Sequence, residues 1–204
     1  MHSIIVDGEK VIPSKIVCIG RNYVAHIEEL GNEVPEDMVV FNKPNTAIAA
    51  QLQYRAEGET LHYEGEILLV VQGGVFTAVG FGLDLTRREL QSTLKKKGLP
   101  WERAKAFDGA AVFSEFVALP EDIGQLSLQL EVDGEMRQAG GVDMMIYPPV
   151  TILEELGKFT TLEDGDLVMT GTPAGVGTIA AGELFQGRIL SRGKELVSAS
   201  WRAR

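Results

Sequence analysis

The sequence predicts a single strand-rich domain of the mixed α+β class. Short apolar runs rich in β-branched residues, such as residues 15–20 (KIVCIG), recur between turn residues and favour many short strands. Asp7-Gly8 and Asp133-Gly134 each stand between two such runs, which is the strongest short-range signal for a β-hairpin. Few segments have helical periodicity, and a length of 204 residues fits one domain spanning residues 1–204.

The strands follow in chain order from these runs. The first Asp-Gly turn predicts two short strands in residues 3–12, and the second predicts a hairpin in residues 126–138. Between and after the hairpins, further strands are expected at residues 15–20, 62–72 and 75–85. Residues 39–48 are expected to be a strand followed by a Pro/Asn turn, residues 162–178 a turn, a strand and a glycine-rich loop, and the C-terminal third short strands. The polar residues 49–60 are expected to form a loop.

Three segments have helical character. Residues 23–30 are followed by Gly31, which is a favourable stop. Residues 86–97 form the best helical pattern, with Thr86 as the expected N-cap, Glu89 three positions later as in a capping box, and Gly98 at the end. Residues 148–159 predict a third, amphipathic helix.

Composition and charge exclude several classes of function. A net charge of −10 and a predicted pI of 4.8 do not suit binding to nucleic acid or to an anionic membrane. The densest basic cluster, Lys95-Lys96-Lys97, is interpreted as a solvated helix end. The single cysteine, Cys18, lies in an apolar strand and is expected to be a buried thiol in a reducing compartment. With no signal peptide and no apolar stretch of about 20 residues, we expect a soluble cytoplasmic protein.

An acidic pair stands at the mouth of the most apolar strand. In HYEGEILLVV, Glu64 and Glu66 share one face of the strand, together with His62. Burying two carboxylates side by side is costly unless a cation pairs with them. Asp84, at the end of the next strand, could complete a set of oxygen ligands if the two strands pair. The alternative is a solvated strand end that binds no metal.

Two further motifs have a functional and a purely structural interpretation. His26 and Glu29 are spaced i, i+3 on a helix, so the carboxylate could orient the imidazole as in a general-base dyad, or both could be surface residues. The loop TGTPAGVGT (residues 170–178) could present Thr172 and backbone N–H groups to a small carboxylate, or could be only a tight turn. It lacks the lysine of a nucleotide-binding phosphate loop.

A third set of candidates follows Asp84. Arg88 and Gln91 are also spaced i, i+3, and Lys105 lies in ERAKAFD. Such positive and polar groups could hold a carboxylate or a developing oxyanion, although each one singly fits an ordinary surface residue.

Taken together and in this order, the motifs GRNYxxH, E-x-E, GLDLTRRELQ, KGLPWxxAKAFD and TGTPAGVG resemble the fumarylacetoacetate hydrolase family. The chain looks most like its short members, the acylpyruvate hydrolases and oxaloacetate decarboxylases, from about residue 15 to residue 204. The resemblance implies a β-roll with peripheral helices, usually as a homodimer. It also implies a metal triad of Glu64, Glu66 and Asp84. The catalytic residues that it implies are a His–Glu dyad on a lid, His26 and Glu29, and a lysine, Lys105. The implied substrate contacts are Arg21, Arg88, Gln91 and Thr172.

The activity that the resemblance implies is metal-dependent cleavage of a carbon–carbon bond in a small 2,4-dioxo acid, an acylpyruvate, to pyruvate and a carboxylic acid. Mg²⁺ is the expected metal, with Mn²⁺ or Ca²⁺ as substitutes. Alternatives that remain open are decarboxylation of oxaloacetate, isomerisation or decarboxylation of a dicarboxylate from aromatic degradation, and binding of metal and 2-oxo acid without turnover. The chain departs from the family at residues 109–116 (GAAVFSEF) and around Gly140-Gly141, which leaves the substrate open.

Overall fold

The computed structural model describes residues 1–29, 31 and 36–204, and it has the strand-rich α+β fold expected from the sequence. The N-terminal part contains β1 (Ile4–Val6), β2 (Glu9–Val11), β3 (Lys15–Gly20), α1 (Val24–Glu29), β4 (Val39–Pro44), β5 (Ile48–Ala49), β6 (Arg55–Ala56), β7 (Glu59–Thr60), β8 (His62–Tyr63), β9 (Gly65–Gln72) and β10 (Val75–Asp84). Three short 3₁₀ turns, at Asn45–Ala47, Ile123–Gln125 and Val142–Met144, connect other elements.

The remaining elements follow β10 along the chain. They are α2 (Arg88–Lys96), α3 (Glu102–Lys105), β11 (Ala111–Phe113), β12 (Val117–Ala118), β13 (Leu126–Val132), β14 (Glu135–Gly141), α4 (Pro149–Gly157), β15 (Leu167–Met169), β16 (Gly177–Thr178), β17 (Leu184–Ser191) and β18 (Lys194–Arg202). No helix in the described part of the chain is long and apolar enough to cross a membrane.

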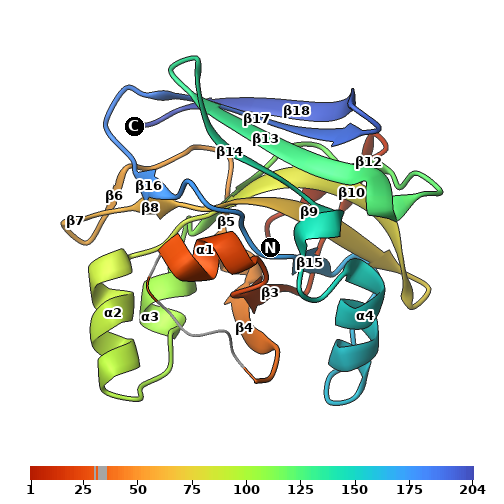
Figure 1. Cartoon of the computed structure of the whole chain (residues 1–204), viewed down its shortest axis with the longest axis horizontal. Helices are drawn as coiled ribbons and strands as arrows, with labels where there is room; N and C mark the ends of the chain where they lie inside the picture. The colour runs from red at the N-terminus through yellow and green to blue at the C-terminus, as the bar shows by residue number, and fades with distance from the viewer. Residues whose placement is uncertain (30, 32–35) are drawn as a thin grey trace.

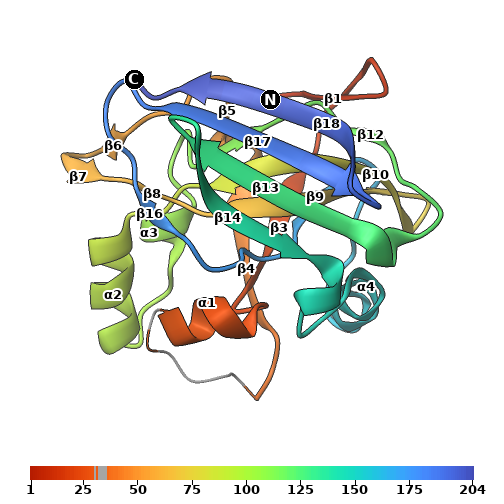
Figure 2. The ribbon, with the colours of Figure 1, turned by 45° about the horizontal axis from the view of Figure 1, so that its top comes forward.

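Two sheets form the body of the molecule (Figure 1). An eight-stranded sheet runs in the order β4-β3-β15-β9-β10-β11-β5, with β12 also paired to β10, and it curls into a half-barrel. A four-stranded antiparallel sheet, β14-β13-β17-β18, lies across β9 and β10, as the tilted view shows (Figure 2). The sheets approach closely at Gly187 of β17, because any Cβ there would meet the ring of Phe81 at 2.0 Å.

Strand β9 is buried on both faces, which explains its continuous apolar run. Ile67 and Leu69 face the core between the two sheets, whereas Leu68 and Val70 face the inside of the half-barrel. Helix α4 packs Ile152 on the outer face of β3 and β15, so the apolar side chains of the sheet are covered by other elements.

Most of the expected elements are confirmed. Both Asp-Gly hairpins form, and the turn residues Asp7, Gly8, Asp133 and Gly134 all have positive φ. The helix expected at residues 23–30 is observed as α1, although Leu30 lies outside the described residues. Gly31 and Gly98 also have positive φ, as expected for residues that end a helix.

Three expectations were wrong. Residues 49–60 are not only a loop, because β6 and β7 form a small hairpin there. The C-terminal strands β17 and β18 are long, because they build half of the second sheet. Thr86 does not cap α2: its hydroxyl lies 2.6 Å from Lys105 Nζ, and the N–H groups of Glu89 and Leu90 donate to Glu59 Oε1 instead.

Candidate active site

Three buried carboxylates meet at one end of the half-barrel. Glu66 of β9 lies opposite Gly82 of β10, and the N–H of Asp84 donates to the carbonyl of Glu64 at 2.8 Å. This pairing places Glu64, Glu66 and Asp84 together, with ligand oxygens all within 4.8 Å of one another. The residues are only 6%, 2% and 1% exposed. The pairing of the two strands therefore brings together the three acids that the sequence pattern singled out.

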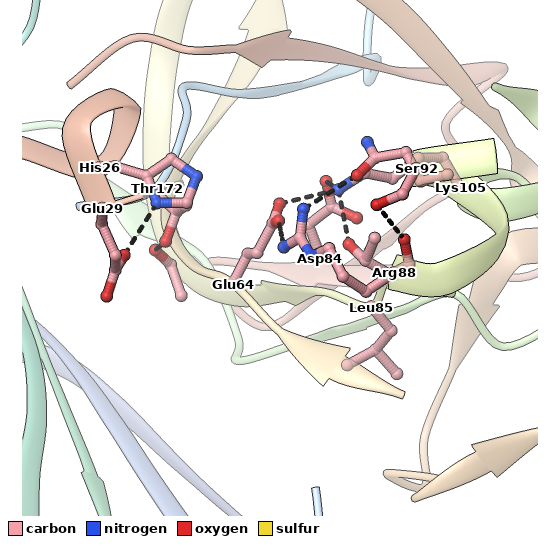
Figure 3. A network of polar contacts seen from close by, with 12 residues as sticks. His26, Glu29, Glu64, Asp84, Leu85, Arg88, Ser92, Lys105 and Thr172 are labelled. Atoms are coloured by element: carbon pink, nitrogen blue, oxygen red, sulfur yellow. Dashed lines mark hydrogen bonds and ion pairs between the residues drawn. The ribbon is translucent and has the colours of Figure 1, made fainter. Parts of the chain in front are cut away.

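Lys105 and Arg88 neutralise part of this charge. Lys105 Nζ lies 2.7 Å from Glu64 Oε2, 2.8 Å from Asp84 Oδ2 and 2.6 Å from Thr86 Oγ1, so all three of its N–H bonds have partners (Figure 3). Arg88 contacts the other oxygen of Glu64. In this arrangement Lys105 holds two members of the acidic triad together.

A second buried lysine, Lys43, lies beneath the site and was not predicted from the sequence. Its Nζ forms an ion pair with Asp84 Oδ1 at 2.8 Å and donates to the backbone carbonyl of Lys105. Lys43 is fully buried near the end of β4. Its only signal in the sequence is a charged residue inside an apolar strand, and that signal does not identify its partner.

The three carboxyl groups differ in their electrostatic surroundings. Burial, together with the neighbouring charges of Asp84 and Glu64, raises the pKa of Glu66 well above its ordinary value. Burial acts in the same direction on Glu64, but Lys105 and Arg88 outweigh it and lower the pKa of that carboxyl. Burial lowers the pKa of Lys105, but the carboxylates of Asp84 and Glu64 raise it, and the net effect is an increase. Among the described residues, Glu66 is the member of the triad that makes no ion pair with a lysine or arginine, and a divalent cation at these oxygens would favour its ionised form.

The glycine-rich loop closes the site on the side of Glu66. The N–H of Gly171 donates to Glu66 Oε2 at 2.7 Å. Gly171 has a φ of +98°, and a Cβ there would meet the Cβ of Asn22 at 2.8 Å, so the loop reaches the carboxylate only with glycine at this position. Asn22 in turn donates to the carbonyls of Thr170 and Tyr147, at 2.8 and 2.9 Å. The GRNY turn and the loop therefore support each other.

Thr172 lines the site, but its hydroxyl is engaged in holding the backbone. Its Oγ1 donates to the carbonyl of Gly65 at 2.8 Å and accepts from Gln138 Nε2 at 2.8 Å. Gln138 was not predicted from the sequence. Its Oε1 accepts the N–H of Gly65 at 2.8 Å and its Nε2 also donates to the carbonyl of Pro173 at 2.8 Å. One buried carboxamide therefore joins the loop to the residue between the two glutamates.

His26 and Glu29 form a contact on α1 (Figure 3). His26 Nδ1 lies 3.2 Å from Glu29 Oε2, and Glu29 Oε1 accepts the N–H of Gly175 at 2.9 Å. His26 is buried and lines the same cleft as the triad, where its charge would lower the pKa of Glu64. Because Nδ1 is held by Glu29, Nε2 is the ring atom left for proton exchange in the cleft.

The remaining candidates lie on the walls of the same cleft. Arg88 Nη1 donates to Gln91 Oε1 at 2.9 Å, and Arg21 lies in the turn that follows β3. The walls of the cleft are formed by Ile19, Gly20, Arg21, His26, Ile27, Phe41, Glu64, Glu66, Asp84, Arg88, Gln91, Lys95, Trp101, Lys105 and Thr172. The fold thus gathers most of the candidate residues around one cavity, and Glu29 supports it from behind His26.

Several residues lie away from the cleft. His62 is half-buried in a backbone bridge to Thr86 and lines a separate hollow, and burial and Arg88 lower its pKa. Cys18 is buried, and burial raises the pKa of its thiol, as expected for an unreactive core residue. Residues 109–116 and Gly140-Gly141, where the sequence departs from the family pattern, also do not line the cleft. Within them, Ser114 accepts the N–H of Phe81, and Gly140 packs on Pro173.

The interpretation of Lys95 as part of a solvated helix end was wrong. Lys96 and Lys97 are exposed, but Lys95 is half-buried and lines the cleft. Its Nζ lies 4.8 Å from the centroid of the Trp101 ring. The i, i+3, i+7 spacing of Arg88, Gln91 and Lys95 places all three on one face of α2, and this was the signal available in the sequence.

Comparison with known proteins identifies relatives along nearly the whole chain. Residues 15–200 match the family model described as fumarylacetoacetate (FAA) hydrolase C-terminal. The oxaloacetate tautomerase YcgM of Escherichia coli is 39% identical over 187 residues, covering 83% of this chain and 85% of its own. An oxaloacetate decarboxylase, mitochondrial, of Dictyostelium discoideum is 33% identical and covers 84% of this chain and 87% of its own.

Two solved structures extend the comparison to the fold. A candidate fumarylacetoacetate isomerase/hydrolase from Oleispira antarctica superposes with a TM-score of 0.94 at 32% identity and covers 100% of both chains. The fumarylpyruvate hydrolase of Pseudomonas aeruginosa, in complex with Mn²⁺ and pyruvate, superposes with a TM-score of 0.88 at 31% identity. It covers 99% of this chain and 95% of its own.

Proposed function

The chain belongs to the fumarylacetoacetate hydrolase family, and we propose that it is a metal-dependent enzyme that interconverts the keto and enol forms of oxaloacetate. The observation that carries this proposal is the buried triad of Glu64, Glu66 and Asp84 facing His26 across one cleft. An enolisation needs a site for the negative charge of the enolate and a base for one carbon-bound proton, and this cleft combines a candidate for each.

The triad would bind Mg²⁺, and the same oxygen donors would accept Mn²⁺ or Ca²⁺. When bound, such a cation supplies Lewis-acid stabilisation of negative charge on the 2-oxo oxygen of the substrate. Lys105 would keep Glu64 and Asp84 in position, because its ammonium group contacts both carboxylates.

Proton transfer would fall to His26 with Glu29. Glu29 Oε2 holds Nδ1, which leaves Nε2 to take a proton from C3 of the keto form and to return it in the reverse direction. The carboxylate of Glu29 stabilises the imidazolium that forms in between. The enol oxygen exchanges its own proton with solvent. Arg21, Arg88 and Gln91 would orient the carboxylates of the substrate, because they line the same cleft.

Hydrolysis of an acylpyruvate is a second candidate, supported by the likeness to the fumarylpyruvate hydrolase. In that reaction His26 takes a proton from water, and the hydroxide adds to the distal carbonyl of the substrate. The carbon–carbon bond then breaks and leaves the enolate of pyruvate, which is protonated, together with a carboxylic acid. Decarboxylation of oxaloacetate reaches the same enolate by loss of CO₂ and needs no base, so the three reactions share one electron sink.

A substrate panel with metal titration tests these proposals. Keto–enol exchange of oxaloacetate, loss of acetylpyruvate, and release of pyruvate from oxaloacetate should be followed with Mg²⁺ and with EDTA. His26→Ala should abolish tautomerisation and hydrolysis but spare decarboxylation, whereas His62→Ala, outside the cleft, should leave all rates within about twofold. Rates that EDTA does not change would refute the metal. Tautomerisation that survives in His26→Ala would refute the base. A cytoplasmic homodimer stays a prediction, which cell fractionation and light scattering would test.

A further inference from the structure

Lys95 occupies a place in the cleft that the proposed reaction does not yet use. It lies on the same face of α2 as Arg88 and Gln91, and its side chain is half-buried. The Nζ atom lies 4.8 Å from the centroid of the Trp101 ring, a cation–π distance. This contact restricts where the ammonium group can lie, so Lys95 presents its charge from a defined position on the wall.

The charged residues that line the cleft differ in their partners. Glu64, Glu66 and Asp84 form the acidic triad. Arg21 and Lys95 lie among the other lining residues. Among the residues that the structure describes, no carboxylate is found in ion-pair contact with Lys95, whereas Arg88 and Lys105 both contact Glu64. The positive charge of Lys95 therefore remains available to an anion in the cleft.

A cation that makes no ion pair with the described carboxylates, in a cleft that also holds the acidic triad, fits a substrate that carries negative charge at both ends. One end, the 2-oxo acid group, would be held at the acidic triad. A second carboxylate near the triad would be repelled by the buried carboxylates. It would lie instead beside positive charge, where a charge-assisted hydrogen bond can form. A substrate with a neutral second end makes no such contact.

We propose that Lys95, held against Trp101, binds the second carboxylate of a dicarboxylic 2-oxo acid and so determines a preference for dianionic substrates. This inference rests on the proposed function, since it concerns the same cleft, and it adds a specificity residue to it.

The electrostatic surroundings of Lys95 give the inference a distinctive pH dependence. The charged groups that act on it are Arg88 on its own helix, Arg21 after β3, Lys105 on α3 and Glu64 beside β9. Burial, then Arg21 and Arg88, lower the pKa of Lys95 to about 8. The ammonium form, which binds a carboxylate, is therefore lost as the pH rises through 8, and the affinity for a dianion should fall in the same range.

The test compares two ligands in the presence of Mg²⁺. Dissociation constants for pyruvate, with one carboxylate, and freshly dissolved oxaloacetate, with two, should be measured by calorimetry for the wild type and for Lys95→Gln. We expect Lys95→Gln to weaken oxaloacetate about 10- to 100-fold and pyruvate less than about twofold. Lys96→Gln, on the exposed side of the same helix, should change neither value. Thermal unfolding followed by circular dichroism establishes that each variant is folded.

A second variant separates charge from shape. Lys95→Arg keeps the positive charge and should retain most of the oxaloacetate affinity, but that affinity should no longer fall between about pH 7 and pH 9, since arginine stays protonated. Equal losses for both ligands in Lys95→Gln, or no loss for oxaloacetate, would overturn the inference. A wild type that binds oxaloacetate no more tightly than pyruvate would also overturn it. If oxaloacetate binds through Lys95 but is not turned over, the proposed function fails and this inference stands.

Discussion

Replacing Gln138 by alanine should both destabilise the protein strongly and lower its affinity for a metal ion. The carboxamide is 1% exposed and makes three hydrogen bonds of 2.8 Å, to the Gly65 N–H, Thr172 Oγ1 and the Pro173 carbonyl. Alanine leaves the Gly65 N–H and the Pro173 carbonyl without these bonds in a buried place, while Thr172 keeps its bond to Gly65. At about 1–3 kcal/mol for each unsatisfied group, the free energy of unfolding should fall by about 2–6 kcal/mol.

The metal site should respond because Gly65 separates the two glutamates of the triad. We expect about a tenfold loss of Mg²⁺ affinity in Gln138→Ala, which is typical when the support of a ligand is removed. Urea unfolding at pH 7, with EDTA and with Mg²⁺, gives the stability, and calorimetry gives the affinity.

Gln186→Ala is the matched control, because Gln186 is exposed on β17 and its loss should cost less than about 0.5 kcal/mol. Gln138→Glu adds a second comparison: it keeps an acceptor for Gly65 but removes both donors. A Gln138→Ala protein that loses less than about 1 kcal/mol and binds Mg²⁺ like its parent would refute the reasoning.

Three further predictions concern other parts of the structure. Glu66→Gln should lower Mg²⁺ affinity at least about tenfold in calorimetry, and parental affinity would remove Glu66 from the ligand set. For Asp166, burial acts to raise the pKa, but hydrogen bonds led by Lys15 outweigh it and lower the pKa. The stabilisation that Asp166 provides is present above its unfolded pKa and is lost as the pH falls through the folded pKa. In urea at pH 7, Asp166→Asn should therefore be less stable than the wild type. Well below pH 3.8, the ordinary pKa of an aspartate, the two proteins should be nearly equal in stability. Glu59→Ala should cost about 1 kcal/mol, because it removes the acceptor for two N–H groups of α2, and an unchanged urea midpoint would contradict this.

The parts of the fold that were predicted correctly depend on short-range chemistry. Asp7-Gly8 and Asp133-Gly134 form hairpin turns because both positions need positive φ, which these residue types tolerate. Strand β9 was recognised from its apolar run, which is buried on two faces. In each case the information lies within about ten residues of the sequence.

The parts that were missed depend on contacts between distant segments. Glu59 replaces Thr86 as the acceptor at the start of α2 because the β6–β7 hairpin lies beside that helix. Lys43 reaches Asp84 from β4, 41 positions away in the sequence. Gln138 reaches Gly65 across 73 positions, at a bulge between β13 and β14. A local sequence pattern does not predict such long-range contacts, because the residue types involved are also common on ordinary surfaces.

The positive groups around the triad are not shared equally by its three acids. This makes Glu66 the residue by which a metal site can be distinguished from an ordinary cluster of buried ion pairs. Lys105 and Arg88 contact Glu64, and Lys105 and Lys43 contact Asp84, whereas Glu66 accepts a bond from the N–H of Gly171.

In an ion-pair cluster, removing one acid leaves an unpaired buried cation and destabilises the protein. Removing the charge of Glu66 leaves no such cation among the contacts described, and it relieves repulsion from two neighbouring carboxylates. With chelator at pH 7, Glu66→Gln should therefore be at least as stable as the wild type, while Glu64→Gln, which deprives Lys105 of a partner, should be less stable. With Mg²⁺ the order should reverse for Glu66→Gln, because the wild type alone gains the full free energy of metal binding. A Glu66→Gln protein that is destabilised equally with and without Mg²⁺ would show that Glu66 serves the fold and not a cation.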